Sequence, residues 1–183
     1  MAYKMDDIKQ TVRYSFGRVL WTHKIHEKQA DIYQEKYKAL EVWKIVTSCV
    51  TSAGVITLIF NDTFAIKIVA VIVSVIAACL ATISSTFNFQ DRADKHRKTA
   101  TKILGIREAL QLLLLKIKTQ KITEDDALTE YEKIIKRLEV IYANAPSTTN
   151  SAVKRAEKAM GVHGDNEITN EEINSGLPDS LKE

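Results

Sequence analysis

The sequence predicts an all-α membrane protein: a two-helix transmembrane hairpin with long cytoplasmic helical extensions that pack as a bundle. Charged residues are absent from 45–61 and again from 68–90. With small extensions, each window approaches or exceeds the roughly 20 residues that cross a bilayer. Charged sequence with helix-like apolar spacing flanks both windows. Bulk composition hides this pattern, because 45% hydrophobic residues, 27% charged residues and a net charge of +3 are ordinary for a soluble chain.

The first segment, 1–41, is expected to be a cytoplasmic amphipathic helix. Asp6 or Asp7 provides a cap, and no proline occurs before Pro146. The helix is therefore expected to run with little interruption into the first span, with Gly17 as the candidate break. The first seven residues are polar and acidic, so we expect no signal peptide there, and insertion would be directed by the hairpin.

The two windows give the transmembrane helices, 42–61 and 68–90, joined by an extracytoplasmic turn at 62–67. Val42 and Trp43 extend the shorter first window, and Lys44 can extend its ammonium toward the interface. A soluble protein with a very hydrophobic hairpin is the alternative. It would have to bury both windows on every side, which is difficult for a chain of 183 residues.

Lysine and arginine near the span ends predict the orientation. Several precede the first span, whereas the turn offers only Lys67, offset by Asp62. The juxtamembrane basic residues after the second span are Arg92, Lys95, Arg97, Lys98 and Lys102. We therefore expect a multi-pass protein of the inner (plasma) membrane with both termini cytoplasmic. The basic run is most simply a stop signal that also favours anionic lipid, and no nucleic-acid partner is expected.

Beyond the hairpin, 91–145 is predicted to form cytoplasmic helices. An apolar stripe runs along the first of them: Ile103, Ile106, Leu110, Leu113, Leu114 and Ile117. Thr123 begins a capping pattern for the next helix, which ends before Pro146. The tail, 146–183, is expected to form short helices or to be disordered.

Each span has a face of small or hydroxyl-bearing residues. Such faces let helices approach closely, within the hairpin or between subunits. Hydroxyls in a membrane helix also bond to their own preceding turn, or line a wet pathway, and these alternatives stay open. The predicted pore-lining or helix-packing residues are Thr47, Ser48, Thr51, Ser52, Gly54, Ser74, Ala77, Ala78, Ala81 and Ser85, and Asp62 is placed at the outer mouth.

Sites for chemistry are sparse. His23, His26 and Glu27 share one helix face but lack the two-histidine spacing of a metalloprotease, so a structural role is favoured and no metal is predicted. Cys49 and Cys79 are expected to be free thiols. No phosphate loop, dinucleotide fingerprint or serine elbow occurs. We expect no catalytic residue and no cofactor.

The segment 21–30, Trp-Thr-His-Lys-Ile-His-Glu-Lys-Gln-Ala, followed by the two spans, Arg97-Lys98-Thr99-Ala100 and Ile106-Arg107-Glu108, resembles the SLATT family. The resemblance covers roughly 6–142, and the tail at 168–181 is also similar. Members are two-transmembrane effector domains associated with bacterial nucleotide-second-messenger and SLOG systems. The resemblance implies a defence effector that breaches the cell's own membrane when a partner signals infection.

The sequence and the resemblance together predict an oligomeric pore-forming or membrane-perturbing effector of a nucleotide-signalled antiphage system. Its expected partners are the lipid bilayer, further copies of itself, and a cyclic-nucleotide signal or a separately encoded nucleotidyltransferase or SLOG protein. The alternative is a non-conducting membrane scaffold that recruits a soluble partner through its cytoplasmic helices. A membrane-bound hydrolase using His23, His26 and Glu27 is the least favoured hypothesis.

Overall fold

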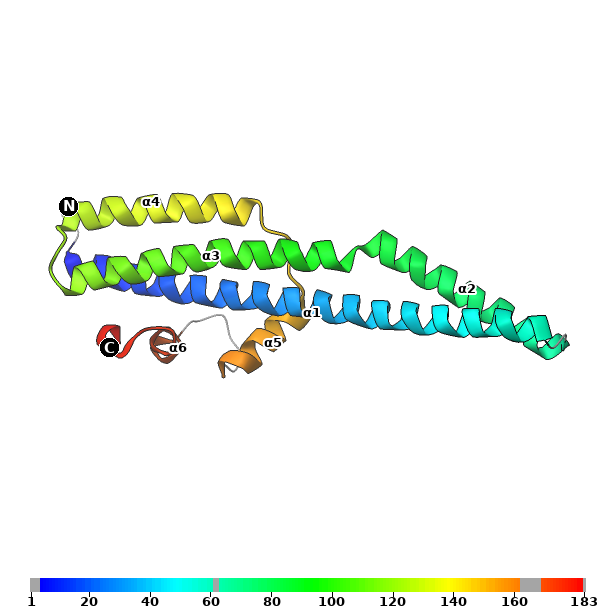
Figure 1. The fold of residues 1–183 in the computed structure, drawn as a ribbon. Helices are drawn as coiled ribbons and strands as arrows, with labels where there is room; N and C mark the ends of the chain where they lie inside the picture. Colours follow the sequence, from blue (N-terminus) through cyan, green and yellow to red (C-terminus); the bar gives the residue numbers. More distant parts are fainter. Residues whose placement is uncertain (1–3, 61–62, 162–168, 183) are drawn as a thin grey trace. The chain divides into compact units, whose positions relative to one another are not determined.

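The computed structural model is all-helical, which confirms the predicted secondary-structure class. It describes residues 4–60, 63–161 and 169–182, and no strand occurs among them. The elements are α1 (Met5–Phe60), α2 (Phe64–Phe87), α3 (Phe89–Lys118), α4 (Glu124–Ala143), α5 (Asn150–Met160), α6 (Asn170–Ser175) and the 3-10 helix η1 (Asp179–Leu181) (Figure 1). They form two compact units: a helical unit, Met1–Ala30 with Asp94–Glu183, and a hairpin unit, Asp31–Ala93.

The first helix is continuous over 56 residues. It passes through Gly17, which is buried in the helical unit, so the helix runs into the apolar stretch as expected and the candidate break at Gly17 does not occur. A glycine in a helix interior costs only about 1 kcal/mol relative to alanine. That cost is small beside the apolar burial of the residues that flank Gly17, Phe16 and Val19, which are fully buried.

Apolar side chains from four parts of the helical unit form one core. The α3 stripe predicted from its spacing is buried throughout, because residues three and four apart fall on one face of a helix. It packs with residues of α1 and α4 and of the chain after Thr169. The buried members outside α3 are Ile8, Val12, Phe16, Val19, Ala127, Ile134, Leu138, Ile173, Leu177 and Leu181.

The segment 169–182 packs on its own helical unit. Arg13, only 3% exposed, donates from Nη1 to the Leu181 carbonyl at 2.7 Å and from Nη2 to Asn174 Oδ1 at 2.9 Å. A β-carbon at Gly176 would overlap a methyl group of Leu20, so the glycine permits the close approach. This segment is therefore held by both apolar contacts and a charged hydrogen-bond donor.

Two threonines cap helices of the helical unit. Thr123 accepts a hydrogen bond from the Asp126 backbone N–H at 3.2 Å and donates to Asp126 Oδ2 at 2.7 Å, as the capping pattern predicted. Thr149 accepts from the Ala152 N–H at 3.4 Å and starts α5. Gly161 ends α5 in the left-handed conformation, with φ 71°.

The hairpin unit holds the apolar part of α1 and all of α2. Helix α2 begins at Phe64, so residues 64–67, which the sequence assigned to the turn, are helical. It ends at Asn88, whose φ of 39° and ψ of 58° lie in the left-handed region that asparagine tolerates. Arg92 Nε donates to the Phe87 carbonyl at 3.0 Å across this break. No feature of the sequence predicted this break between the second span and α3.

Candidate functional site

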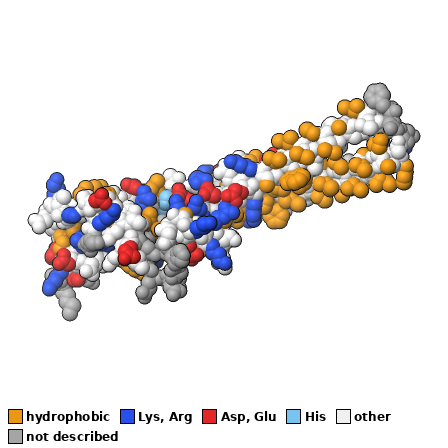
Figure 2. Space-filling view, turned by 90° about the horizontal axis from the view of Figure 1, so that it is seen from below, with side chains coloured by type: hydrophobic (Ala, Val, Ile, Leu, Met, Phe, Trp, Pro, Cys, Tyr) orange, Lys and Arg blue, Asp and Glu red, His pale blue; other side chains and the backbone are white. Residues whose placement is uncertain are grey.

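The hairpin unit exposes large apolar side chains along both of its helices. Ile45, Phe64 and Val71 are 62%, 75% and 63% exposed, and none of the most apolar window of α2 is buried. Both α1 and α2 contain stretches long and apolar enough to cross a membrane. Figure 2 shows apolar side chains covering the hairpin, whereas the helical unit is rich in charge. A soluble monomer rarely exposes so large a contiguous apolar surface, so this surface is the candidate functional site.

One face of each hairpin helix is turned inward. On α1, Thr47 is 8% exposed, and Thr51 and Gly54 are half-buried, at spacings of four and three. On α2, the half-buried residues recur every three or four positions and include both small and larger side chains: Ile66, Ala70, Val73, Ala77, Leu80 and Ser84. Because small residues let helices approach closely, we attribute this burial to packing of α1 against α2 within the hairpin unit.

The hydroxyl-bearing face predicted for α1, called here the hydroxyl arc (Thr47, Ser48, Thr51 and Ser52), is therefore divided. Ser48 and Ser52 are exposed, whereas Thr47 and Thr51 lie on the inward face. Their hydroxyls mostly bond to the preceding turn: Thr51 donates to the Thr47 carbonyl at 2.8 Å, and Ser52 to the Ser48 carbonyl at 3.0 Å. Each of these hydroxyl oxygens keeps a lone pair, so the bonds satisfy the donors without removing acceptors from the helix surface.

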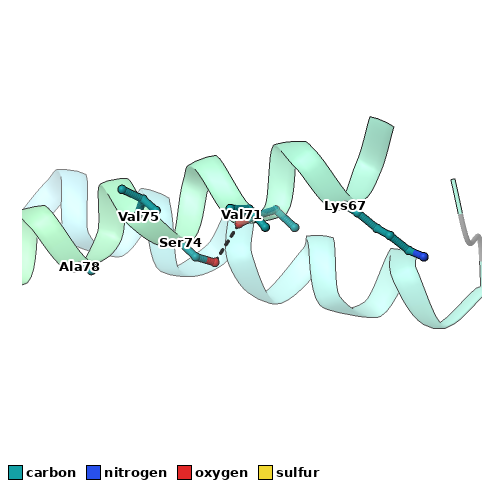
Figure 3. A pocket seen from close by; sticks show the side chains of 6 residues that line it. Lys67, Val71, Ser74, Val75 and Ala78 are labelled. Atoms are coloured by element: carbon teal, nitrogen blue, oxygen red, sulfur yellow. Dashed lines mark hydrogen bonds between the residues drawn. The ribbon is translucent and has the colours of Figure 1, made fainter. Parts of the chain in front are cut away.

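The small face of α2 is also divided. Ala77 is inward, whereas an outward stripe consists of Ser74, Ala78, Ala81 and Ser85. The outward stripe borders a shallow groove of about 540 Å³, lined by Lys67, Ala70, Val71, Ser74, Val75 and Ala78 (Figure 3). Ser74 donates to the Ala70 carbonyl at 2.8 Å, as Figure 3 also shows. The exposed thiols of Cys49 and Cys79 lie on the hairpin helices and are free.

Asp62, the residue expected at the outer mouth, falls outside the described residues. The juxtamembrane basic residues divide between the units. Arg92 belongs to the hairpin unit, and the other four lie on α3 in the helical unit. All five are exposed: Arg92, Lys95, Arg97, Lys98 and Lys102.

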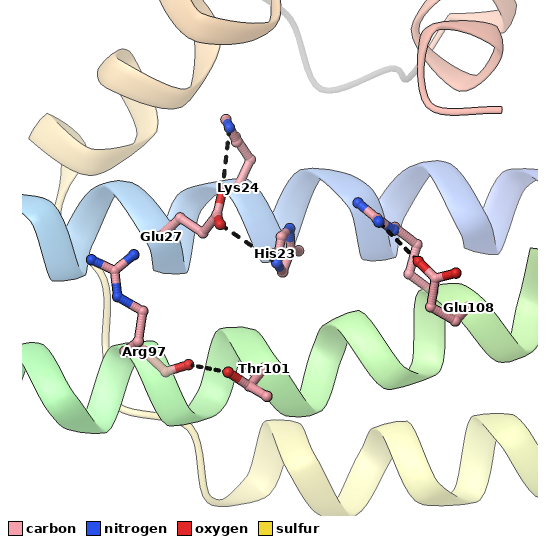
Figure 4. Close-up of polar contacts among 7 residues, drawn as sticks. His23, Lys24, Glu27, Arg97, Thr101 and Glu108 are labelled. Atoms are coloured by element: carbon pink, nitrogen blue, oxygen red, sulfur yellow. Dashed lines mark hydrogen bonds and ion pairs between the residues drawn. The ribbon is translucent and has the colours of Figure 1, made fainter. Parts of the chain in front are cut away.

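The histidine segment lies in the helical unit and is buried. Glu27 accepts from Lys24 Nζ at 3.2 Å and lies 3.9 Å from His23 Nε2 (Figure 4). Burial lowers the pKa of His23. The negative charge of Glu27 partly opposes this lowering, and the positive charge of Arg107 adds to it. Among the described residues, no group of three or more side chains of metal-ligating type is placed to hold an ion.

His26 does not join His23 and Glu27 in a shared site, but pairs with His96 of α3. Their Nδ1 atoms are 3.0 Å apart, and the two side chains are almost fully buried. Burial, reinforced by His26, lowers the pKa of His96 to about 4, and burial together with His23 lowers the pKa of His26. Both rings are therefore neutral near pH 7, and one Nδ1–H donates to the other Nδ1. His96 could not be found from the sequence, because nothing in the local pattern around it marks it as the partner of a residue 70 positions away.

A second buried polar contact lies one turn further along α1. Gln29 Oε1 accepts from the Thr149 backbone N–H and from the Thr149 hydroxyl, both at 2.8 Å. It thereby ties the start of α5 to α1. The histidine pair and Gln29 are thus buried polar contacts of α1 with α3 and with the start of α5, and buried polar contacts of this kind help to specify how helices pack.

A family model matches residues 8–172: the SMODS and SLOG-associating 2TM effector domain family 4. This span is most of the chain, and the family's description names a two-transmembrane effector domain. The chain belongs to this family, as its sequence resemblance indicated. No curated protein and no solved structure matches the chain.

Proposed function

We propose that the hairpin crosses the bacterial inner membrane, and that several copies assemble into a pore-forming or membrane-perturbing effector of a nucleotide-signalled antiphage system. The observation that carries the proposal is the exposed apolar surface along both hairpin helices. The family description, which names a two-transmembrane effector domain, supports it. The family name also links the chain to SMODS and SLOG proteins, from which we expect its activating signal or partner to come.

Helix lengths fit a bilayer. Helix α2 has 24 residues, and at about 1.5 Å of rise per residue it spans roughly 36 Å, enough for a hydrocarbon core of about 30 Å. On α1, the stretch from Val42 to Phe60 spans roughly 28 Å by the same rise. Basic residues before the first span and after the second favour an orientation with both termini in the cytoplasm and the hairpin tip outside.

A pore requires more than one copy, because two helices cannot enclose a channel. The outward stripe of α2 offers small side chains against which a neighbouring helix can pack closely. On α1, Ser48 and Ser52 are the exposed members of the hydroxyl arc. We therefore assign subunit packing to the outward stripe, and pore lining to Ser48 and Ser52.

The test is efflux of ions and dye from liposomes that contain the purified protein, with and without candidate cyclic nucleotides. Wild type is expected to release both, and Ser52→Trp to block or change conduction. The matched control is Ile72→Trp, which adds an indole at an apolar position of α2 that is 53% exposed. Equal effects of the two substitutions would remove the pore-lining assignment.

Tight vesicles under every condition, with the protein shown to be inserted, would instead support a non-conducting scaffold. In that case the helical unit should bring down a soluble partner in stoichiometric amount. Exposed apolar side chains of α3 and α4, such as Leu112 and Val140, are where such a partner would bind.

A further inference from the structure

Three aromatic rings gather at the base of the hairpin unit, beside the break at Asn88. Phe87 and Phe89 stack with centroids 5.6 Å apart, and Tyr33 of α1 stacks on Phe89 at 6.1 Å. We call Tyr33, Phe87 and Phe89 the aromatic cluster. Because phenylalanine and tyrosine rings hold their positions with few rotatable bonds, the cluster is a firm platform for neighbouring groups.

Two cations border this cluster. Lys36 Nζ lies 5.6 Å from the centroid of Phe89 and 6.0 Å from that of Tyr33. Arg92 follows Phe89 by three residues, and its Nε binds the Phe87 carbonyl, which fixes the guanidinium beside the same rings. Lys36 therefore lies near Phe89, and Arg92 is bonded to the backbone of Phe87, so the two cations reach the aromatic cluster from different helices.

Neither cation has a carboxylate partner within the described part of the chain: no ion pair of Lys36 or Arg92 occurs there. The acidic residues beside them in sequence, Glu35 and Asp91, have interactions of their own. By contrast, Lys44, two residues into the apolar stretch that begins at Val42, is neutralised by Glu41 at 2.7 Å. The base of the hairpin thus carries two positive charges with spare hydrogen-bond donors.

The depth of these cations matches a phospholipid headgroup. Lys36 precedes the apolar stretch that begins at Val42 by six residues, or roughly 9 Å of helix. Arg92 follows Phe87 by five residues, or roughly 8 Å. The headgroup layer extends about 5–8 Å beyond the hydrocarbon on each side, and long basic side chains can reach into it.

We propose that Lys36 and Arg92 bind the phosphodiester of an anionic phospholipid, and that the aromatic cluster packs against its glycerol and upper acyl chains. The site rests on the proposed membrane insertion of the hairpin. Lys36 supplies a point charge, and the guanidinium of Arg92 supplies the N–H groups that Nε does not use. One anionic lipid would then bridge α1 and the start of α3, at the level of the break at Asn88.

The proposal is tested by the quenching of Trp43 fluorescence in vesicles. Trp43 is 59% exposed, about two helical turns from Lys36, and Trp21 is removed as Trp21→Phe so that a single reporter remains. The protein is reconstituted into mixed phosphatidylcholine and phosphatidylglycerol vesicles, in which only one of the two lipids carries brominated chains. Brominated phosphatidylglycerol is expected to quench Trp43 more strongly than brominated phosphatidylcholine does. The affinity of the site for phosphatidylglycerol relative to phosphatidylcholine should be about fivefold for each cation that holds the headgroup.

Matched variants separate this site from general attraction to the membrane. Lys36→Gln with Arg92→Gln should abolish the preference for phosphatidylglycerol. Lys38→Gln, which removes an exposed cation two residues away, should leave most of it, and Arg92→Lys, which keeps the charge, should retain part of it. An unchanged elution profile and Trp43 emission maximum would show that each variant is folded.

Equal quenching by the two brominated lipids, or a preference that survives the double substitution, would overturn the proposal. An equal loss in Lys38→Gln would do the same, because it would show a diffuse charge effect. If added inorganic phosphate abolishes the preference, the site takes free phosphate and the lipid assignment is wrong. Absence of quenching by either lipid is a different failure, because it would show that the hairpin is not in the bilayer.

Discussion

Acidification is predicted to loosen the helical unit through the His26–His96 pair. Between about pH 4 and 6.5, an unfolded chain protonates His96, whereas the folded protein keeps it neutral, because its folded pKa is about 4 against a model value of 6.5. The unfolded state then binds more protons, so the free energy of unfolding rises with pH in this window and falls as the pH is lowered. The stability that depends on neutral His96 is present above pH 6.5.

The size of the effect follows from these two values. A shift of one pKa unit corresponds to about 1.36 kcal/mol, so full passage below pH 4 removes about 3 kcal/mol. Most of that, about 2 kcal/mol, is already lost between pH 7 and pH 5 by the same linkage. The side chain of His96 is only 2% exposed, so solvent screening reduces this figure little. The lowered pKa of His26 acts in the same direction.

The assay is guanidinium unfolding of the full chain in detergent at several pH values. Trp21, which is half-buried in the helical unit, reports the transition in a Trp43→Phe background. His26→Leu with His96→Leu should flatten the pH dependence by about 2 kcal/mol between pH 7 and 5. His96→Leu alone should destabilise at pH 7 by about 1–3 kcal/mol, because it leaves the buried Nδ1 of His26 without this partner. A double variant with the wild-type pH slope would refute the reasoning.

Three further changes concern the helical unit. Leu177→Ala should lower the free energy of unfolding by about 2–5 kcal/mol, seen as a lower denaturation midpoint, because its side chain is 5% exposed in the core. Thr123→Ala should cost about 1 kcal/mol through loss of the α4 cap, and a thermal melt would measure it. Arg13→Gln should speed amide exchange around Leu181, because a buried charge-assisted hydrogen bond worth about 1.5–3 kcal/mol is lost, whereas Arg18→Gln, at an exposed position, should not.

Local patterns predicted the helices and much of the core. The α3 stripe is buried at every predicted position, because apolar residues three and four apart fall on one face of a helix, whereas Leu112 and Leu115 lie off that face and are exposed. The cap at Thr123 was also predictable, since it needs only residues within one turn. Features that depend on one turn or one face of a helix were thus accessible from the sequence.

Features that depend on how helices pack were not predictable. His26 and Glu27 are neighbours in sequence, yet His26 pairs with His96, because the register between α1 and α3 decides which side chains meet. The break at Asn88 was missed for a related reason. Asparagine only tolerates the left-handed conformation, and the contact of Arg92 with the Phe87 carbonyl, which accompanies the break, involves the side chain of a different helix.

The division of the hydroxyl arc of α1 bears directly on how the proposed pore should be probed. Periodicity assigned Thr51 and Ser52 to one arc, but Thr51 is half-buried inside the hairpin unit and Ser52 is exposed. An indole at Thr51 would therefore disturb the packing of α1 on α2, and its effect on conduction would report a damaged hairpin. An indole at Ser52 meets lipid, a neighbouring copy or a water-filled path. The Ser52 indole should change efflux without changing the fold of the monomer only where it meets a neighbouring copy or a water-filled path. Substitution of Ser52 therefore tests the pore hypothesis without disturbing the packing of the hairpin.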